Sequence, residues 1–257
     1  FEMFKSAGIT PILAFHNTPN WMSRDGTRDS PPKDFEAWGK LVSEVVRHVN
    51  VEKNYGVKYF EVWNEPDLPF WKNGTPEDFV KLYDVFVKAV RSVDPQARVG
   101  GPATSGSGAE SGMVYRGAAQ WTYLKAFIRH CGDNKVPLDF LSFHRYELDP
   151  GQAKLTCEEI RGWLQEYPHM RDAELFVSEW NIAPGKDRSG RMDTNFNASS
   201  ATAWMVGAMD GGLDLAAFFN FSDAAWPAPG VLFQQETGLV APDCTPKPVY
   251  NAMRLWS

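Results

Sequence analysis

Residues 57–67 read Val-Lys-Tyr-Phe-Glu-Val-Trp-Asn-Glu-Pro-Asp, an apolar run that ends in an amide, a carboxylate and a proline. The run predicts a buried strand, and Asn64 and Glu65 fall where backbone pairing stops. Pro66 cannot donate to a ladder and favours an extended conformation for Glu65, so we expect the Glu65 carboxyl group to project from the end of a sheet. Taken alone, Asn-Glu-Pro is more typical of a polar turn than of a catalytic site.

A second segment has the same design. Residues 175–181, Leu-Phe-Val-Ser-Glu-Trp-Asn, form another short apolar strand that carries a glutamate near its end. Glycoside hydrolysis requires two carboxyl groups, one protonated to assist the leaving group and one ionised to attack or to activate water. Glu65 and Glu179 are therefore the candidate catalytic residues. Trp63 and Trp180 offer flat faces on which a sugar can stack, although core packing explains Trp63 equally well.

Four stretches, in this order, resemble a known family. They are EVWNEPDLPFW, VGGPAT, LSFHRYE and FVSEWN. They are similar to the retaining glycoside hydrolases of family 39, the β-xylosidase and α-L-iduronidase family, and the resemblance runs from about Leu13 to the end. Asn-Glu-Pro is shared by a whole clan of (β/α)8 barrels, but the ordered set is more specific. The resemblance implies that Glu65 is the acid/base, that Glu179 is the nucleophile and that Asn64 holds the sugar 2-hydroxyl.

Polar and aromatic residues at other predicted strand ends complete the candidate site. His144 and Tyr146 follow a strand predicted from Leu138 to Phe143, and because they are two residues apart they should point the same way, with Arg145 pointing elsewhere. A histidine at a strand end is often structural, but the resemblance implies that His144 and Tyr146 face the nucleophile. The further candidates for substrate binding are His16, Trp21, Trp180 and Trp226.

Strands alternate with helices along the chain, which predicts an α/β fold with a parallel sheet and crossover helices. A (β/α)8 TIM barrel needs eight strands. We therefore expect residues 1–257 to form a single, incomplete TIM-barrel catalytic domain of about six parallel strands, without the first strand, first helix and second strand. The strands are expected near Ile9, Lys58, Arg98, Leu138, Leu175 and Leu215.

Helices are expected between these strands. Asp34 and Thr75 are suitable N-cap residues, and apolar residues at helical spacing follow each of them. Trp38, in the helix after Asp34, is expected in the core. The predicted helices span 1–8, 34–49, 75–93, 121–130, 157–167 and 196–209, and a final helix closes the chain.

Composition narrows the possible partners. The net charge of −6 disfavours nucleic acid, whereas 10 Trp among 257 residues suit a carbohydrate. Three cysteines show neither a metal-binding spacing nor an even number, and no cofactor or metal is implied. No run of 18 apolar residues predicts a membrane span, and the first residues do not resemble a signal peptide, which leaves the compartment open.

The leading functional hypothesis is a retaining O-glycosidase acting by double displacement, with β-xylosides as the first substrates to test. The Glu65 and Glu179 carboxyl groups should then lie about 5–5.5 Å apart. A non-catalytic carbohydrate-binding or structural remnant of such a barrel is one alternative. An unrelated barrel isomerase or aldolase is another, although no strand-end lysine or metal-binding cluster supports it.

The number of strands also leads to a prediction about self-association. An open sheet would expose unpaired backbone groups at the edges 9–15 and 215–221. We therefore expect a homo-oligomer that covers the open barrel. In the resembling family the early strand ends help to bind the sugar ring, so the incomplete barrel is expected to have weakened activity.

Overall fold

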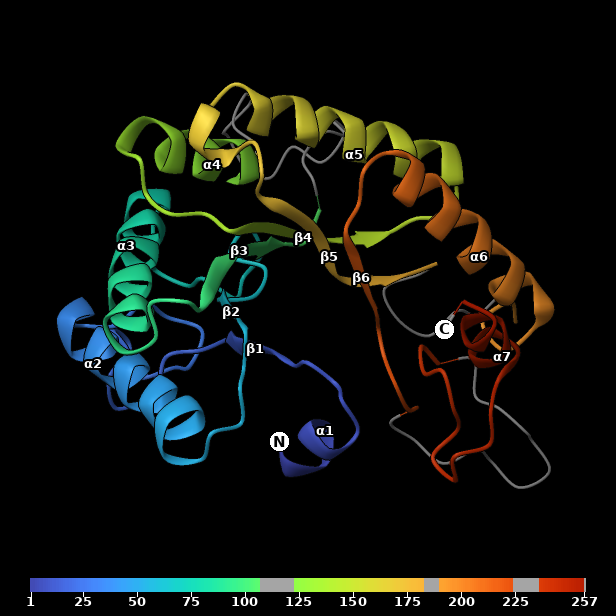
Figure 1. Cartoon of the computed structure of the whole chain (residues 1–257), viewed down its shortest axis with the longest axis horizontal. Coiled ribbons are helices and arrows are strands. Elements are labelled where there is room, and N and C mark those ends of the chain that lie inside the picture. Colours follow the sequence, from blue (N-terminus) through green and yellow to red (C-terminus); the bar gives the residue numbers. More distant parts are fainter. Residues whose placement is uncertain (107–122, 183–189, 224–235, 257) are drawn as a thin grey trace. The chain divides into compact units, whose positions relative to one another are not determined.

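The computed structural model describes residues 1–106, 123–182, 190–223 and 236–256 (Figure 1). Strands β1 to β4 pair in parallel in chain order, and β5 pairs with β6 in parallel. The chain therefore has an α/β fold with six parallel strands, the incomplete TIM-barrel type expected from the sequence. The strands are β1 (Ile12–Phe15), β2 (Tyr59–Val62), β3 (Arg98–Thr104), β4 (Phe140–Tyr146), β5 (Glu174–Asn181) and β6 (Leu215–Phe218).

The chain divides into two compact units, each described here by itself. The first comprises Phe1–Phe143 and Trp163–Glu174, and the second His144–Gly162 and Leu175–Ser257. A single catalytic domain over the whole chain stays a prediction.

The helices alternate with the strands as the sequence predicts. The Asp34 carboxylate caps α2 by accepting bonds from the backbone N–H groups of Glu36 and Ala37, and Thr75 forms a capping box with Asp78 at the start of α3. Among the described helices, none combines the length and hydropathy that crossing a bilayer requires. The helices are α1 (Glu2–Ser6), α2 (Phe35–Val46), α3 (Pro76–Val93), α4 (Tyr123–Asn134), α5 (Pro150–Gln165), α6 (Asn195–Asp210) and α7 (Pro248–Arg254), with a π-helical segment (Arg47–Glu52) and a 3-10 turn (Pro168–Met170).

The first unit has an aromatic core between its strands and two of its helices. Helices α2 and α3 lie side by side (Figure 1). The Phe15 ring lies 5.5 Å from Phe86 and 6.4 Å from Trp38, centroid to centroid. Trp38 is fully buried, which confirms its predicted place in the core. Each such side chain contributes about 1.5–3 kcal/mol to the free energy of unfolding through the apolar surface that it buries.

Strand β1 is shorter than predicted. It begins at Ile12 and not at Ile9. Pro11 has no N–H to donate to a ladder, so pairing starts only after it. Ile9 is 54% exposed as a result.

Candidate active site

Glu65 lies in a tight turn just after β2. The predicted extended conformation is wrong, because its φ of 47° is in the left-handed region. Its backbone N–H donates to the Ala103 carbonyl on β3 at 2.7 Å, and its own carbonyl accepts from Leu68 N–H at 3.0 Å. These two bonds close a turn around Pro66 and hold a strained backbone of the kind often found at functional sites. The candidate acid/base therefore sits on a backbone fixed from two sides.

Asp67, two residues further on, belongs to the same turn and is a residue that the sequence pattern did not single out. Its carboxylate accepts bonds from the Ser105 backbone N–H at 2.9 Å and from the Ser105 hydroxyl at 2.6 Å. Burial raises the pKa of Asp67, while the bonds from Ser105 work in the opposite direction. The acidic residue that follows Asn-Glu-Pro was the available signal. Asp67 ties the Glu65 turn to the end of β3.

Of the two tryptophans of the first unit considered for sugar stacking, one is buried and one is exposed. Trp63 is buried, with its ring 4.7 Å from Trp71 and its indole N–H donating to the Phe70 carbonyl at 3.0 Å. Core packing is therefore the correct interpretation for Trp63. Trp21 is 73% exposed in the loop after β1, where His16 is also exposed. An open indole face of this kind suits sugar stacking, so Trp21 remains a candidate.

The loop that carries Trp21 is anchored to the start of α3. The Arg24 guanidinium donates to both carboxylate oxygens of Asp78, at 2.8 and 3.1 Å, and to the Asn73 carbonyl at 2.9 Å. These bonds lower the pKa of Asp78. Lys72 N–H also donates to the Asp29 carbonyl at 2.7 Å. The loop after β1 is therefore held at Arg24, by Asp78 and Asn73, and at Asp29, by Lys72.

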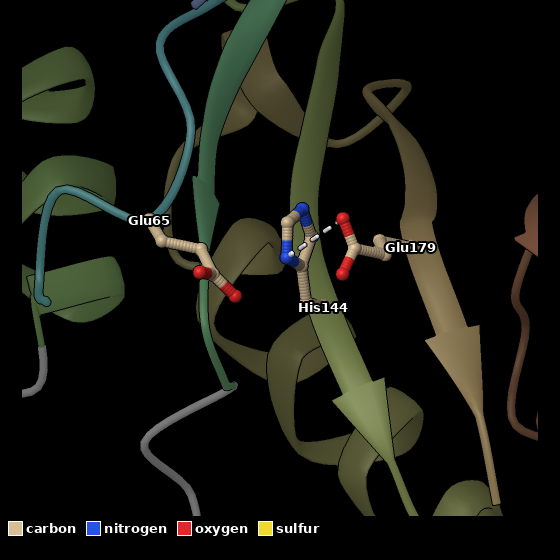
Figure 2. Close-up of side chains that lie close together, drawn as sticks. All are labelled: Glu65, His144 and Glu179. Atoms are coloured by element: carbon tan, nitrogen blue, oxygen red, sulfur yellow. Dashed lines mark ion pairs between the residues drawn. The ribbon is translucent and has the colours of Figure 1, made fainter. Parts of the chain in front are cut away.

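In the second unit, Glu179 is surrounded by side chains from β4. The Tyr146 hydroxyl donates to Oε1 of Glu179. Nδ1 of His144 lies 3.8 Å from Oε2 of the same carboxylate (Figure 2). His144 and Tyr146 thus point the same way, as their spacing predicts. Arg145 between them turns to Glu147, whose carboxylate accepts its bond at 2.8 Å. The bond from Tyr146 fixes one carboxylate oxygen of Glu179, and a nucleophile needs such a fixed position.

Trp180 packs away from this group. It is 1% exposed, and its ring stacks on Trp204 at 4.3 Å with Phe218 at its edge. Neighbouring residues of a strand face opposite sides, so a Glu179 side chain that reaches Tyr146 sends Trp180 to the other side. This placement supports core packing. The predicted contact of Trp180 with a sugar stays a prediction that its burial does not favour.

Asn181, the last residue of β5, is a second residue that the sequence pattern did not single out. Its side-chain amide donates to the Phe219 carbonyl at 2.6 Å and to the Thr237 carbonyl at 3.1 Å, and its oxygen accepts from Ile182 N–H at 2.7 Å. The C-terminal end of β5 is therefore held by the segments that follow β6.

The remaining candidates have simpler outcomes. Asn64 is half-buried between Trp63 and Glu65, and Trp226 lies outside the described residues. His144 and Glu179 are also of the types that bind divalent metals. The roles of Asn64, His16 and Trp21 at a substrate stay predictions.

Strand–helix alternation, with glutamates at the carboxyl ends of strands, is typical of the class of (β/α)-barrel glycoside hydrolases. Within that class, the chain belongs to glycosyl hydrolases family 39, whose sequence profile matches residues 25–257. The resemblance carried by the four sequence stretches is thereby confirmed.

Curated relatives agree with the family. A β-xylosidase of Geobacillus stearothermophilus is 31% identical over 293 aligned residues, covering 100% of this chain and 54% of that protein. A human α-L-iduronidase is 28% identical over 162 residues, covering 55% of this chain and 23% of that protein. The chain thus spans about half the length of the β-xylosidase relative it matches. A crystal structure of a monomeric β-xylosidase from Caulobacter crescentus CB15 shares the fold, with a TM-score of 0.79, 22% identity and coverage of 100% of this chain and 54% of that one.

Proposed function

We propose that the protein is a retaining glycoside hydrolase that cleaves O-glycosidic bonds by double displacement. The observation that carries the proposal is the Glu179 carboxylate on β5, bonded by the Tyr146 hydroxyl and approached by His144. A carboxylate held in this way is positioned for attack on an anomeric carbon. Family membership supports the same assignment.

In the first step the Glu179 carboxylate attacks the anomeric carbon while Glu65 gives its proton to the departing oxygen, so that a glycosyl ester forms as the glycosidic bond breaks. In the second step Glu65 takes a proton from water, whose oxygen attacks the same carbon and releases Glu179. Two inversions give net retention. Asn64 would hold the sugar 2-hydroxyl during both steps.

A fluorinated aryl glycoside tests this mechanism directly. Its slow second step traps the ester, so mass spectrometry of digested protein should find the sugar on the peptide that contains Glu179. Proton NMR should show that the first-formed anomer has the configuration of the substrate. Hydrolysis that survives Glu179→Ala would remove the proposal and favour another catalytic site, and absence of hydrolysis by the original protein would favour a non-catalytic role.

Glu65 lies in the first unit and Glu179 in the second. The distance between their carboxyl groups therefore stays a prediction, of about 5–5.5 Å. A separation above about 6.5 Å would imply inversion instead.

A β-linked pentoside is the proposed substrate, with aryl β-xylosides first. The support is the likeness to proteins named β-xylosidase, one of them 31% identical. The family also contains α-L-iduronidases, so a panel of aryl glycosides that includes iduronides is the appropriate screen. Measurable turnover of iduronides alone would contradict the pentoside assignment.

Self-association is the proposed assembly. In the described residues β1 pairs with β2 alone, and the nearby side chains of Met3 and Ile9 are 71% and 54% exposed. An edge strand beside exposed apolar groups favours pairing with another chain. Light scattering after size-exclusion chromatography should show a species larger than 28.9 kDa. A monomer at every concentration would contradict this proposal.

Tyr146→Phe is expected to lower kcat/KM by about 10- to 100-fold, the equivalent of one charge-assisted hydrogen bond. The reason is that the ring still packs while the donor to Glu179 is lost. Steady-state rates on an aryl β-xyloside measure the effect, and thermal unfolding checks the fold. Tyr59→Phe is the matched control, since the Tyr59 hydroxyl bonds to Glu174 in the other unit. Equal effects of the two changes would contradict the role of Tyr146.

A further inference from the structure

A buried ionic cluster in the second unit plays no part in the proposed chemistry. The Lys247 ammonium, 0% exposed, lies 2.6 Å from Oδ1 of Asp193 and 2.7 Å from Oδ2 of Asp223. It also donates to the Glu236 carbonyl at 3.0 Å. Two carboxylates thus face one ammonium, and burial raises the pKa of Asp223 although Lys247 lowers it.

The cluster connects three segments that are distant in sequence. Asp193 lies just before α6, in the connection that follows β5, Asp223 follows β6, and Lys247 is the residue before α7. In parallel α/β proteins the connections that follow strands form the functional face. Lys247 therefore joins the connections after the last two strands on the side where Glu179 lies along β5.

A short chain of bonds leads from Lys247 to the strand of the nucleophile. Lys247 holds the Glu236 carbonyl, and Asp223 accepts from Gly238 N–H at 2.8 Å. Thr237 is fixed between these two residues. Its carbonyl accepts from the Asn181 amide at 3.1 Å and from Asn220 N–H at 3.1 Å. Asn181 is two residues beyond Glu179, at the end of β5.

We infer that Lys247 is a positioning residue, which holds segment 236–240 against Asn181 and thereby fixes the end of β5 that carries Glu179. The inference rests on the proposed function for its catalytic consequence. The alternative is an ordinary ionic cluster that affects stability alone, as many buried ion pairs do.

The same unit supplies a matched control at the opposite end of the strand. Arg161 forms an ion pair with Asp214, whose carboxylate also accepts from Leu175 N–H at 2.7 Å. This pair holds the start of β5, four residues before Glu179. Arg161→Met therefore loosens the same strand without touching the segment that contacts Asn181.

Two variants remove the ammonium. Lys247→Met keeps the aliphatic stem but removes the ammonium that lies between the two buried carboxylates. The double variant Asp193→Asn/Lys247→Met leaves one carboxylate, and so has the same net charge as the original cluster. The double variant keeps the inference testable if the single variant does not fold. Circular dichroism at the assay temperature selects the variant used.

Hydrogen exchange on the full chain tests the positioning without any substrate. The amide of Ile182 bonds to the Asn181 side chain, and the amide of Asn220 bonds to Thr237. Both should exchange at least about 10-fold faster when Lys247 is replaced. The amide of Leu175 should exchange faster in Arg161→Met and at an unchanged rate in the Lys247 variants. Unchanged exchange at Ile182 and Asn220 would overturn the inference whatever the activity.

Kinetics test the catalytic consequence. Loss of Lys247 should lower kcat by about 10- to 100-fold, because small displacements of a reacting group are costly. The rate of trapping of Glu179 by the fluorinated glycoside should fall by the same factor, and KM should change by less than about 3-fold. Arg161→Met should keep kcat within about 3-fold. An unchanged trapping rate in the Lys247 variant would overturn the inference, whereas absence of trapping in the original protein would overturn the proposed function and leave the exchange result to decide on Lys247.

Discussion

Replacing Glu179 with glutamine should lower turnover of an aryl β-xyloside by roughly 10⁴- to 10⁶-fold, the range found when a covalent nucleophile is removed. An amide does not attack an anomeric carbon at a useful rate, yet it has nearly the shape of the carboxylate. The Tyr146 hydroxyl can still donate to the amide oxygen, so the fold should survive. Initial rates and thermal unfolding of the two proteins measure the two effects.

Added azide provides a second readout for Glu179. In Glu179→Ala the space left by the side chain admits azide, which attacks the anomeric carbon once and gives an inverted glycosyl azide. Glu174→Gln is the matched control, because Glu174 begins the same strand and forms an ion pair with Arg98 at 3.2 Å. That change should affect stability more than turnover, as expected for the amino-terminal end of a barrel strand. Equal losses of turnover in the two glutamine variants would contradict the nucleophile assignment.

Glu65→Ala should produce a loss that depends on the leaving group. Substrates with poor leaving groups need the proton, so their hydrolysis should slow by about 10²- to 10⁴-fold. Dinitrophenolate departs from its glycosides without being protonated. The rate at which these substrates form the glycosyl ester should therefore change little. Single-turnover rates across a series of aryl glycosides give the dependence on leaving-group basicity.

Azide separates the two glutamates by stereochemistry. In Glu65→Ala, azide should intercept the ester on Glu179 and give a product with the configuration of the substrate. Glu77→Ala, at an exposed position in the first turn of α3, is the control for removal of a carboxyl group from the same unit. An inverted azide from Glu65→Ala, or a uniform loss on all substrates, would reject the acid/base role.

The sequence predicts those parts of the fold that depend on local chemistry. Apolar runs located the strands, the caps at Asp34 and Thr75 located two helices, and alternation placed His144 with Tyr146. The turn at Glu65 was missed because it depends on a bond to Ala103, 38 residues away along the chain. The same alternation that placed Tyr146 also separates Trp180 from Glu179, and that signal was available in the sequence.

The Lys247 cluster marks the limit of prediction from one sequence. A lysine before a proline reads as an exposed charge at a helix start, and nothing local indicates that it is buried. Its partner Asp193 precedes a helix, where acidic residues are common as caps. Its other partner, Asp223, follows a strand. Only the tertiary arrangement of three connections makes the three charges meet.

The contact between Arg24 and Asp78 has a consequence for protein engineering. Loop exchange between homologous enzymes is a usual route to new specificity. The segment from His16 to Lys33 lies between β1 and α2, so it is a natural choice for such an exchange. Its orientation, however, depends on Asp78, which also caps α3 through Thr75 and lies outside those borders. A graft into a recipient that has an uncharged residue at the third position of the corresponding helix would carry Trp21 without its anchor. The transferable module is therefore the loop together with the first turn of α3.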